Sequence, residues 1–317
     1  MSAASHPVTI AIVGATAAGK TGLSLDLAQR LGGEIVNTDA MQLYRGMDIG
    51  TAKLPPSERR GIVHHLLDRL DVTETATVAD FQGWAREVIA EIRGRGNTPV
   101  LVGGSALYTR AILDGFEFPG TDESLRRELE VELERVGHSV LHQRLADLDP
   151  VAGARIPREN GRRIVRALEV IALTGRPYSA SLPTLKYADP RTLQIGVDID
   201  RPALDLRIEM RVQQMYDEGL VEEAERLDLR FERARTASRA IGYRDAADHL
   251  SGEITLDAAI ARTQAATRRF ARRQDGWFRK DPRVSWLHFD DPDRVEKAIA
   301  LIEGLDRSSA STQGGAS

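Results

Sequence analysis

Residues 14–21 carry the clearest chemical signal in the chain, because they read Gly-Ala-Thr-Ala-Ala-Gly-Lys-Thr and complete the pattern G-x-x-x-x-G-K-[ST]. The apolar run Val8–Val13 leads into this loop, and residues that favour a helix follow it up to Leu31. In that setting backbone N–H groups converge on phosphate oxygens, Lys20 adds a positive charge, and Thr21 can offer its hydroxyl to a magnesium ion. The loop predicts a site for a di- or triphosphate, formed by Gly14, Ala15, Thr16, Ala17, Ala18, Gly19, Lys20 and Thr21.

An acidic residue is expected near this loop, because phosphate-transferring proteins usually hold magnesium with an acid at the end of a neighbouring strand. The strand predicted at Pro99–Val102 ends in Gly103-Gly104-Ser105 and supplies none. The best-placed acid is Asp39, just past the strand predicted at Glu34–Asn37. Ligands of a doubly wound sheet lie outside the carboxyl ends of its strands, so Asp39, Ser105 and the loop are expected around one crevice. There Asp39 can bind magnesium or accept a proton, and the alternative is that it caps a helix or turn.

Strand and helix signals alternate along the chain in the manner of a parallel α/β sheet. Two further strands are predicted at Leu193–Ile199 and Val284–Phe289. A helix is expected from about Val78 to Ile92, where the apolar residues share one face at helical spacing. Later helices are expected at about Pro202–Glu218, Leu220–Arg230, Ile241–Leu250 and Leu256–Arg279.

Residues 121–173 are almost wholly helical in character and strongly charged, without a strand signal. This stretch predicts an all-helical lobe inserted into an α/β core. We therefore predict an α/β fold with a P-loop NTPase-like parallel sheet flanked by helices, in which residues 1–116 and 190–306 form the core and residues 117–189 form the insertion. The Ser/Gly-rich residues 307–317 are expected to be a disordered tail.

Composition excludes several kinds of chemistry. The 317 residues contain no cysteine, which rules out disulfides, thiolate nucleophiles and cysteine-ligated zinc, and the seven histidines lack the spacing of metal ligands. No apolar run approaches the length of a membrane span, and residues 1–7 are too short and polar for a signal peptide. We therefore expect a cytoplasmic protein that binds no membrane.

Positive charge is unevenly distributed, although the formal net charge is −4. Arginines cluster at residues 155–166, 226–244 and 262–283, and the last stretch also holds Lys280 and few acids. Local basic patches can bind phosphates even on an acidic protein. The alternative for each stretch is an ordinary solvated helix face.

Taken in order, the motifs resemble those of the tRNA dimethylallyltransferases, also called tRNA isopentenyltransferases, in their compact bacterial form. Members transfer a dimethylallyl group from its diphosphate to N6 of the adenosine on the 3′ side of the anticodon. A phosphate-binding loop alone is generic, whereas the ordered set is specific and spans nearly the whole chain. Besides the loop, the set consists of Asp39–Tyr44, Asp48–Lys53, His64–Asp68, Val102–Tyr108, Arg166–Val170, Ile241–Arg244, Arg273-Gln274 and Trp277–Arg279.

The resemblance implies a catalytic set of Asp39, Thr21 and Arg211. Asp39 would take the proton from N6, a weak nucleophile, while Thr21 would hold the cofactor Mg²⁺ and Arg211 would bind the departing diphosphate. It also implies a surface for the tRNA anticodon stem-loop, from which the adenine is extruded. The residues implied for that surface are Asp39, Ala40, Met41, Gln42, Ser105, Arg162, Arg163, Ile164, Val165, Arg166, Arg239, Ala240, Ile241, Gly242, Tyr243 and Arg244.

Dimethylallyl diphosphate and tRNA are thus the expected partners of a monomeric enzyme. Two other functions stay open at this point. An adenylate isopentenyltransferase or a nucleotide kinase would act on free nucleotides, with less need of the helical insertion and the arginine runs. A regulatory switch would only bind and hydrolyse nucleotide, which the lack of an acid after Val102 disfavours. Two of the implied site residues also have alternatives. Arg211 could be a surface residue of an amphipathic helix and not a ligand of the diphosphate, and Tyr243 could be a packing residue and not a contact of the tRNA.

Overall fold

The computed structural model describes residues 6–115, 118–181, 185–231 and 236–313. The chain divides into two compact units, of which the first comprises Met1–Leu113 and Asp189–Ser317 and the second Asp114–Ala188. The insertion predicted from the sequence comprised residues 117–189, so its start differs from that of the second unit by three residues and its end by one. Each unit is described by itself.

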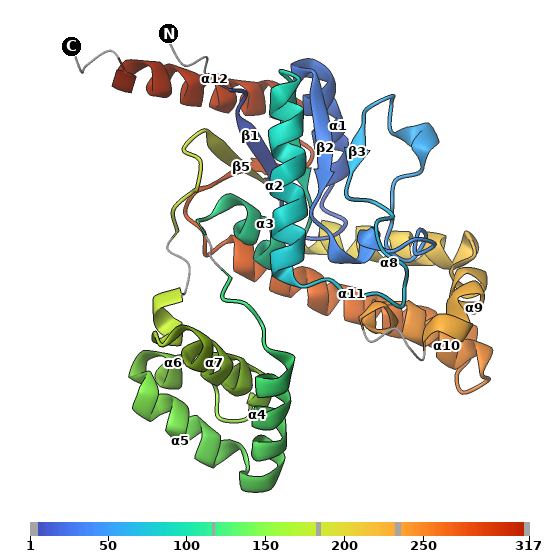
Figure 1. Cartoon of the computed structure of the whole chain (residues 1–317). Helices are drawn as coiled ribbons and strands as arrows, with labels where there is room; N and C mark the ends of the chain where they lie inside the picture. The colour runs from blue at the N-terminus through green and yellow to red at the C-terminus, as the bar shows by residue number, and fades with distance from the viewer. Residues whose placement is uncertain (1–5, 116–117, 182–184, 232–235, 314–317) are drawn as a thin grey trace. The chain divides into compact units, whose positions relative to one another are not determined.

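A six-stranded sheet forms the centre of the first unit, with the strand order β3-β2-β4-β1-β5-β6 in the described part of the chain (Figure 1). Every neighbouring pair is parallel, and Ile10 on β1 stands in register with Val100 on β4 and Leu193 on β5. The predicted α/β class with a parallel sheet is confirmed. The strands are β1 Thr9–Val13, β2 Gly33–Asn37, β3 His64–His65, β4 Thr98–Val102, β5 Thr192–Asp198 and β6 Val284–His288.

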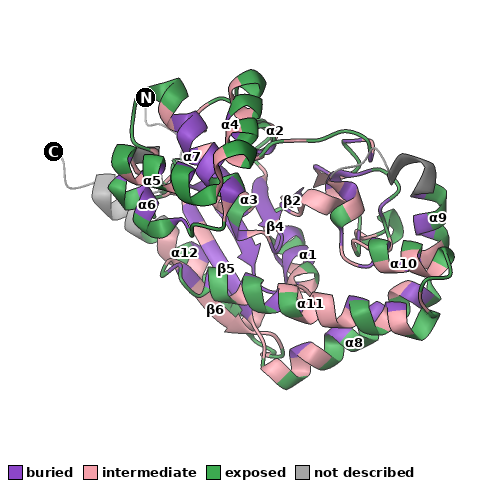
Figure 2. Ribbon diagram, turned by 90° about the horizontal axis from the view of Figure 1, so that it is seen from below, coloured by how far each residue is buried: buried purple, intermediate pink, exposed green. Residues whose placement is uncertain are grey.

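Five of these strands lie within a residue of their predicted bounds, whereas the strand β3 was not predicted. β3 has two residues, and a run so short shows no alternation of apolar and polar side chains. It extends the sheet beside β2, where Ile35 pairs with His64 and Val36 with His65. The central strands are buried on both faces, as Figure 2 shows for β4 and β5. Such burial explains why they read as continuous apolar runs.

Helices cover the sheet because their apolar faces are buried against it. α1 begins at Lys20 directly after Gly19, ends at Gly32 in the left-handed conformation, and packs on β2 and β4. α2 begins with a capping box between Thr77 and Asp80. The helices of this unit are α1 Lys20–Leu31, α2 Val78–Gly94, α3 Ala106–Leu113, α8 Arg201–Asp217, α9 Leu220–Phe231, α10 Tyr243–Leu250, α11 Leu256–Phe278 and α12 Arg294–Gln313, with short 3₁₀ turns η1 Ala40–Leu43, η2 Pro56–Glu58 and η4 Ala237–Arg239.

The end of the chain differs from the prediction of a disordered tail at residues 307–317. α12 continues to Gln313, so residues 307–313 are helical, while residues 314–317 lie outside the described part. Residues 307–313 contain neither glycine nor proline, and the first glycine stands at 314. Without a helix breaker, a helix anchored earlier by buried Ala298 and Ile302 can propagate through Ser and Ala residues.

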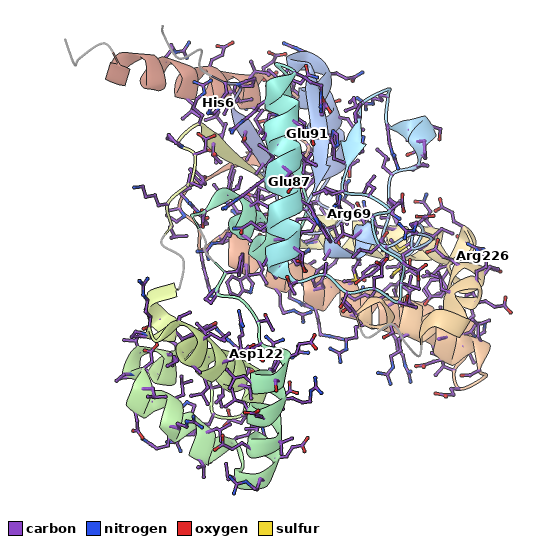
Figure 3. The ribbon with its side chains drawn as sticks, viewed as in Figure 1. His6, Arg69, Glu87, Glu91, Asp122 and Arg226 are labelled. Atoms are coloured by element: carbon purple, nitrogen blue, oxygen red, sulfur yellow. The ribbon has the colours of Figure 1, made fainter. Side chains whose placement is uncertain are left out.

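The second unit is all-helical in its described residues, as predicted for the insertion. Its core is formed by apolar residues such as Leu141, Leu145 and Ile164. Asp122 caps the first helix, and Figure 3 shows it at the start of α4. The helices are α4 Glu123–Val136, α5 His138–Leu148, α6 Pro150–Arg155 and α7 Gly161–Thr174, followed by the 3₁₀ turn η3 Tyr178–Ser181.

None of the helices in the described residues combines the length and the apolarity that crossing a bilayer requires.

Candidate active site

The phosphate-binding loop joins β1 to α1 in a conformation that depends on glycine. Gly14 has φ +134° and Gly19 has φ +105°, values that side chains with a Cβ rarely adopt. A Cβ on Gly14 would also stand 3.0 Å from the carbonyl oxygen of Val197 on β5. The loop therefore lies against the end of the sheet, with its N–H groups at the start of α1 as the sequence predicted.

Lys20 lies across this loop. Its Nζ donates to the carbonyl oxygens of Gly14 at 3.1 Å and of Ala15 at 2.7 Å. Burial, together with the charge of nearby Arg211, lowers the pKa of Lys20 to about 7. Because an anion beside the ammonium group favours its protonated form, binding of a diphosphate is expected to be coupled to protonation of Lys20.

Two helices from the C-terminal half of the chain support the loop. Gln274 on α11 accepts a hydrogen bond from the backbone N–H of Thr16 at 2.8 Å, and Arg207 on α8 donates to the carbonyl oxygen of Ala17 at 2.8 Å. Arg211, one turn after Arg207, reaches the hydroxyl of Thr16 at 3.5 Å. Burial and the charge of Arg207 lower the pKa of Arg211. The structure thus brings Arg211 to the phosphate-binding loop and not to an open helix surface.

Asp39 follows β2 and lies in a tight turn. Its N–H donates to Oδ1 of Asn37 at 2.9 Å, and Nδ2 of Asn37 donates to the carbonyl oxygen of Asp39 at 2.8 Å. One carboxylate oxygen, Oδ1, accepts the N–H of Met41 at 2.9 Å and so caps η1. Among the described residues no hydrogen bond reaches the other oxygen, Oδ2. Asp39 is therefore a turn cap whose second carboxylate oxygen accepts no hydrogen bond from the described residues, and burial raises its pKa.

A cavity of about 110 Å³ joins these groups. The charged and polar residues in its lining include Lys20, Thr21, Arg211, Asp39 and Gln42. The large apolar residues in its lining are Ile35, Leu54, Leu67 and Val102, which come from β2, β4 and the loops around β3. The remaining lining residues are Thr16, Ser24, Asn37, Thr51, Ala52, His64, Gly103, Gly104 and Gln274. Among the described residues, this crevice is thus lined by two cations, one carboxylate and several apolar side chains.

The two glycines after β4 explain why no acid stands there. A Cβ on Gly103 would lie 2.1 Å from Oγ1 of Thr38, and a Cβ on Gly104 would lie 2.1 Å from Nε2 of Gln274. The end of β4 therefore packs directly against the turn after β2 and against α11. Ser105, predicted to border the crevice, does not line the cavity and instead directly precedes α3, where its Oγ accepts the N–H of Tyr108 at 3.4 Å.

The motifs at residues 48–53 and 64–68 support the wall of the cavity. Lys53 is buried, and its Nζ donates to Asp48 and Asp68 at 2.6 Å each and to the carbonyl oxygen of Tyr44 at 2.9 Å. This one ammonium group ties together the segments that contribute Thr51 and Leu67 to the cavity. Sequence reasoning quoted both motifs as part of the resemblance but gave Lys53 no role.

Glu223 on α9 holds the same segment from the other side. Its buried carboxylate accepts the backbone N–H groups of Asp48 at 3.1 Å, Ile49 at 2.9 Å and Gly50 at 3.1 Å. It also accepts the hydroxyl of Tyr243 at 2.6 Å. A carboxylate with so many donors is fully hydrogen-bonded although buried.

Tyr243 was implied as a tRNA-binding residue, and the structure corrects this for its side chain. Tyr243 is 0% exposed and packs so closely on Gly50 that a Cβ there would lie 2.4 Å from the ring. Its hydroxyl donates to Glu223, and burial followed by the charge of Glu223 raises its pKa. A ring so enclosed cannot stack on a base, so the alternative of a packing residue holds.

Tyr243→Phe is accordingly expected to act on stability and not on RNA. Removal of the hydroxyl takes one donor from the buried Glu223, which costs about 1–3 kcal/mol of the free energy of unfolding. Urea unfolding measures this loss, while filter binding is expected to give an unchanged dissociation constant for tRNA. The exposed neighbour Arg244 supplies the comparison, since Arg244→Ala leaves the core intact. A Tyr243→Phe protein of wild-type stability with weakened tRNA binding would contradict the packing role.

The other residues implied for the tRNA surface differ in exposure, and Ala40, Met41, Gln42, Ser105 and Ile241 are partly exposed. Arg162, Arg163, Arg239 and Arg244 are exposed, so their guanidinium groups are accessible to phosphates. Ile164, Val165 and Ala240 have buried side chains and Gly242 is buried as well, so at these four positions the predicted tRNA contact stays a prediction and does not involve an exposed side chain. Apolar residues at these positions alternate with the arginines because one face of each short segment is turned inward.

Arg166 has a structural role within the second unit. Its guanidinium donates to Glu169 at 2.9 Å and to the carbonyl oxygens of Pro119 at 2.8 Å and Gly120 at 3.2 Å. Glu169 is completely buried and also accepts Arg126 at 2.8 Å. These hydrogen bonds offset the free-energy cost of burying the Glu169 carboxylate. The guanidinium of Arg166 is therefore held by partners within the second unit.

The adjacent histidines contact different hydrogen-bond partners. Nε2 of His65 lies 2.6 Å from the carboxylate of Glu34, while Nδ1 of His64 lies 2.9 Å from the carbonyl oxygen of Ile62. Burial lowers the pKa of His64, which lines the cavity. In the described residues no group of three or more His, Cys, Asp or Glu side chains is arranged to hold a metal ion.

Comparison with known proteins identifies the family of this chain. The chain matches the family model described as IPP transferase over residues 42–281. A tRNA dimethylallyltransferase from a Nocardioides species is 68% identical over 294 residues, which are 92% of this chain and 95% of that protein. The tRNA dimethylallyltransferase of Streptomyces coelicolor is 56% identical over 306 residues, 95% of this chain and 98% of that protein.

Solved structures of similar proteins indicate the same family. The tRNA isopentenylpyrophosphate transferase of Bacillus halodurans superposes with a TM-score of 0.71 at 41% identity, covering 97% of this chain and 99% of that one. A eukaryotic dimethylallyltransferase acting on tRNA gives a TM-score of 0.83 at 27% identity, covering 95% of this chain and 80% of that one. The resemblance inferred from the motifs is confirmed by relatives that span nearly the full chain. The chain therefore belongs to the IPP transferase family, among the tRNA dimethylallyltransferases.

Proposed function

We propose that the chain transfers a dimethylallyl group from dimethylallyl diphosphate to N6 of the adenosine 3′-adjacent to the anticodon of tRNA. The observation that carries this proposal is the single cavity that Lys20, Thr21 and Arg211 share with Asp39. Cations suited to a diphosphate and a carboxylate suited to an amine proton stand around one space, and apolar residues complete its wall. That combination fits a prenyl diphosphate and a nitrogen nucleophile.

The reaction forms a bond between N6 and C1 of the dimethylallyl group and breaks the bond between C1 and the diphosphate oxygen. Oδ2 of Asp39 accepts the proton that N6 loses, which makes this weak nucleophile more reactive as bonding develops. Lys20, Arg211 and the loop N–H groups bind the negative charge on the departing diphosphate. The apolar side chains in the lining of the cavity also disfavour water, which would otherwise trap an allylic cation.

The lining residues fit a magnesium ion held largely by the diphosphate itself. Mg²⁺ commonly takes one or two protein oxygens together with phosphate oxygens and waters. Thr21 at the start of α1 offers such an oxygen beside the loop, and Asp39 is the one carboxylate among the lining residues in the described part of the chain. We propose that Thr21 holds the ion, which would add positive charge to the diphosphate as it departs.

The tRNA side of the proposal rests on exposed residues. The turn at Asp39–Gln42 faces the cavity, and Arg162, Arg163, Arg239 and Arg244 offer exposed guanidinium groups for the phosphates of the anticodon stem-loop. Ser105 lies one residue beyond the lining and stays part of the proposed surface. We further propose that the enzyme is a monomer and that it acts on tRNA in the cytoplasm.

Mass spectrometry of tRNA tests the function directly. Purified protein, Mg²⁺ and dimethylallyl diphosphate are incubated with an unmodified tRNA whose anticodon is followed by adenosines, and in parallel with free AMP. A mass increase of one prenyl group on the tRNA at the adenosine next to the anticodon is expected, with no product from AMP. Prenylation of AMP alone would instead assign the chain to the enzymes that modify free nucleotides.

A further inference from the structure

The phosphate-binding loop contains a residue other than glycine in a left-handed backbone conformation. Ala17 has φ +64°, and within residues 14–21, all of which the structure describes, it is the one non-glycine residue with a positive φ. A Cβ makes this conformation unfavourable for alanine, whereas glycine adopts it freely. Such a residue persists where its surroundings hold it, and residues of this kind cluster at sites that are preorganised for a ligand.

Arg207 on α8 holds the backbone of Ala17 from outside the loop. Its Nε donates to the carbonyl oxygen of Ala17 at 2.8 Å, and its Nη2 lies 3.7 Å from the place that a Cβ on Gly19 would take. The guanidinium carbon of Arg207 lies 5.5 Å from the centre of the Phe289 ring, which follows β6 and supports the side chain. A helix residue 190 positions away in sequence thus fixes the peptide that joins Ala17 to Ala18.

The direction of this carbonyl group decides where the next N–H group points. In a planar trans peptide, the C=O of Ala17 and the N–H of Ala18 point in opposite directions. Because Arg207 binds the oxygen on the side of α8, the N–H of Ala18 points back into the loop and donates to the carbonyl oxygen of Ala15 at 3.3 Å. N–H groups that converge in this way bind phosphate oxygens. If Ala17 relaxed to a negative φ, this peptide would turn and the loop would lose its shape.

We propose that Arg207 is a positioning residue for the diphosphate: by holding the carbonyl oxygen of Ala17, it keeps this residue left-handed and the loop shaped for the anion before the donor binds. The inference rests on the proposed function, because it takes dimethylallyl diphosphate as the ligand. Arg211, one turn later on α8, lines the cavity, whereas Arg207 is not among the described residues of the lining. Arg207 therefore acts through Ala17. The competing explanation is a simple attraction of the diphosphate by the charge of Arg207.

Steady-state kinetics of Arg207→Ala test this role. The KM for dimethylallyl diphosphate is expected to rise roughly ten- to a hundredfold, the range of one hydrogen bond from a charged donor, because the loop is ready in a smaller fraction of the molecules. Turnover at saturating donor and tRNA should fall much less, since the bound diphosphate itself restores the loop. The control is Arg201→Ala, which removes an arginine of the same helix that pairs with Asp205 and should leave the KM unchanged.

A second substitution separates positioning from charge. Glycine at position 17 adopts a positive φ without the cost of a Cβ, so Arg207→Ala/Ala17→Gly is expected to lower the raised KM again by roughly five- to tenfold. A glycine cannot restore a lost charge, so simple attraction predicts no recovery. The matched control is Arg207→Ala/Ala18→Gly, which places the glycine at the next residue. The φ of Ala18 is not positive, so this variant should keep the KM of Arg207→Ala.

Three results would overturn the proposal: a wild-type KM in Arg207→Ala, no recovery on adding Ala17→Gly, or an equal recovery on adding Ala18→Gly. If wild-type protein prenylates tRNA and one of these results is found, the role of Arg207 alone is wrong. If wild-type protein prenylates no tRNA, the proposed function itself is wrong. Calorimetry with inorganic diphosphate on the same variants then tests Arg207 separately, with the dissociation constant expected to follow the order given for the KM.

Discussion

Asp39→Asn is expected to lower the single-turnover rate of prenyl transfer by about 10²–10⁴-fold, the range typical for removal of a general base. The substitution is chosen because an asparagine side chain is nearly the same shape and its Oδ1 can still accept the N–H of Met41. The turn after β2 should therefore persist, together with its hydrogen bonds to Asn37. What the variant lacks is an oxygen able to take a proton from N6.

Rapid-quench measurement with saturating tRNA and dimethylallyl diphosphate gives this rate without contributions from product release. Asp26→Asn serves as the control, since Asp26 is a surface acid on α1 that pairs with Arg60 at 2.8 Å. It should retain the full rate. Wild-type turnover in Asp39→Asn would show that Asp39 is not the base.

The pH dependence of the rate gives a second view of Asp39. Burial raises the pKa of Asp39 above its ordinary value, and only the ionised carboxylate can accept a proton. As pH falls through this raised pKa, the carboxylate becomes protonated and the rate should decline. In Asp39→Asn this acidic decline should be absent, because the amide does not titrate.

Lys20→Met and Arg211→Ala are expected to give the other large effect, a loss of about 10²–10³-fold each in kcat/KM for dimethylallyl diphosphate. Both cations face the cavity beside the phosphate-binding loop, and Arg211 reaches the hydroxyl of Thr16. Loss of either one leaves developing charge on the diphosphate less well compensated. Neither residue is proposed to contact tRNA, so the dissociation constant for tRNA should stay near the wild-type value.

Initial rates over a range of donor concentrations, combined with filter binding of tRNA, distinguish the two substrates. Arg60→Ala is a suitable control, because Arg60 is an exposed cation of the same unit that pairs with Asp26. It should change neither quantity. Selective loss of tRNA binding in Lys20→Met or Arg211→Ala would refute their assignment to the diphosphate.

Lys20 should also shape the alkaline side of the pH profile. Burial and Arg211 lower the pKa of Lys20 to about 7 in the free protein. As pH rises above this value, the free protein loses the ammonium charge that attracts the diphosphate, and kcat/KM for the donor should fall. Lys20→Met has no ammonium group to lose, so its already low kcat/KM should not show this decline.

Much of this protein could be read from the sequence because the relevant signals are local. The phosphate-binding loop is eight consecutive residues whose backbone conformation follows from Gly14 and Gly19, and the strand before it and the helix after it are adjacent in the chain. Asp39 was predicted from its position after a strand, because parallel strands present their carboxyl ends at one edge. The helical insertion was visible because more than fifty residues lack a strand signal.

Only the tertiary structure decided which residues meet across the chain. Gln274 supports Thr16 from 258 residues away, and Glu223 holds the segment around Ile49 from a different helix. The residues next to Gln274 and Glu223 in the sequence carry no pattern that predicts these contacts. Gln274 was noted in the sequence analysis only as part of the motif Arg273-Gln274. Arg211 was assigned to the diphosphate only through the family resemblance, because its local pattern is that of any arginine on an amphipathic helix, and its contact with Thr16 depends on the packing of α8 against the loop.

The tertiary structure also decided which side chains are buried. Tyr243 and Arg166 have the residue types of an RNA-binding surface, but one ring is enclosed beside Gly50 and one guanidinium is held by Glu169. Residue type and spacing determine which backbone conformations and which chemistry are available to a segment. Whether a side chain is exposed, and which partner it finds, depends on the packing of segments that are distant in sequence, which the local pattern does not contain.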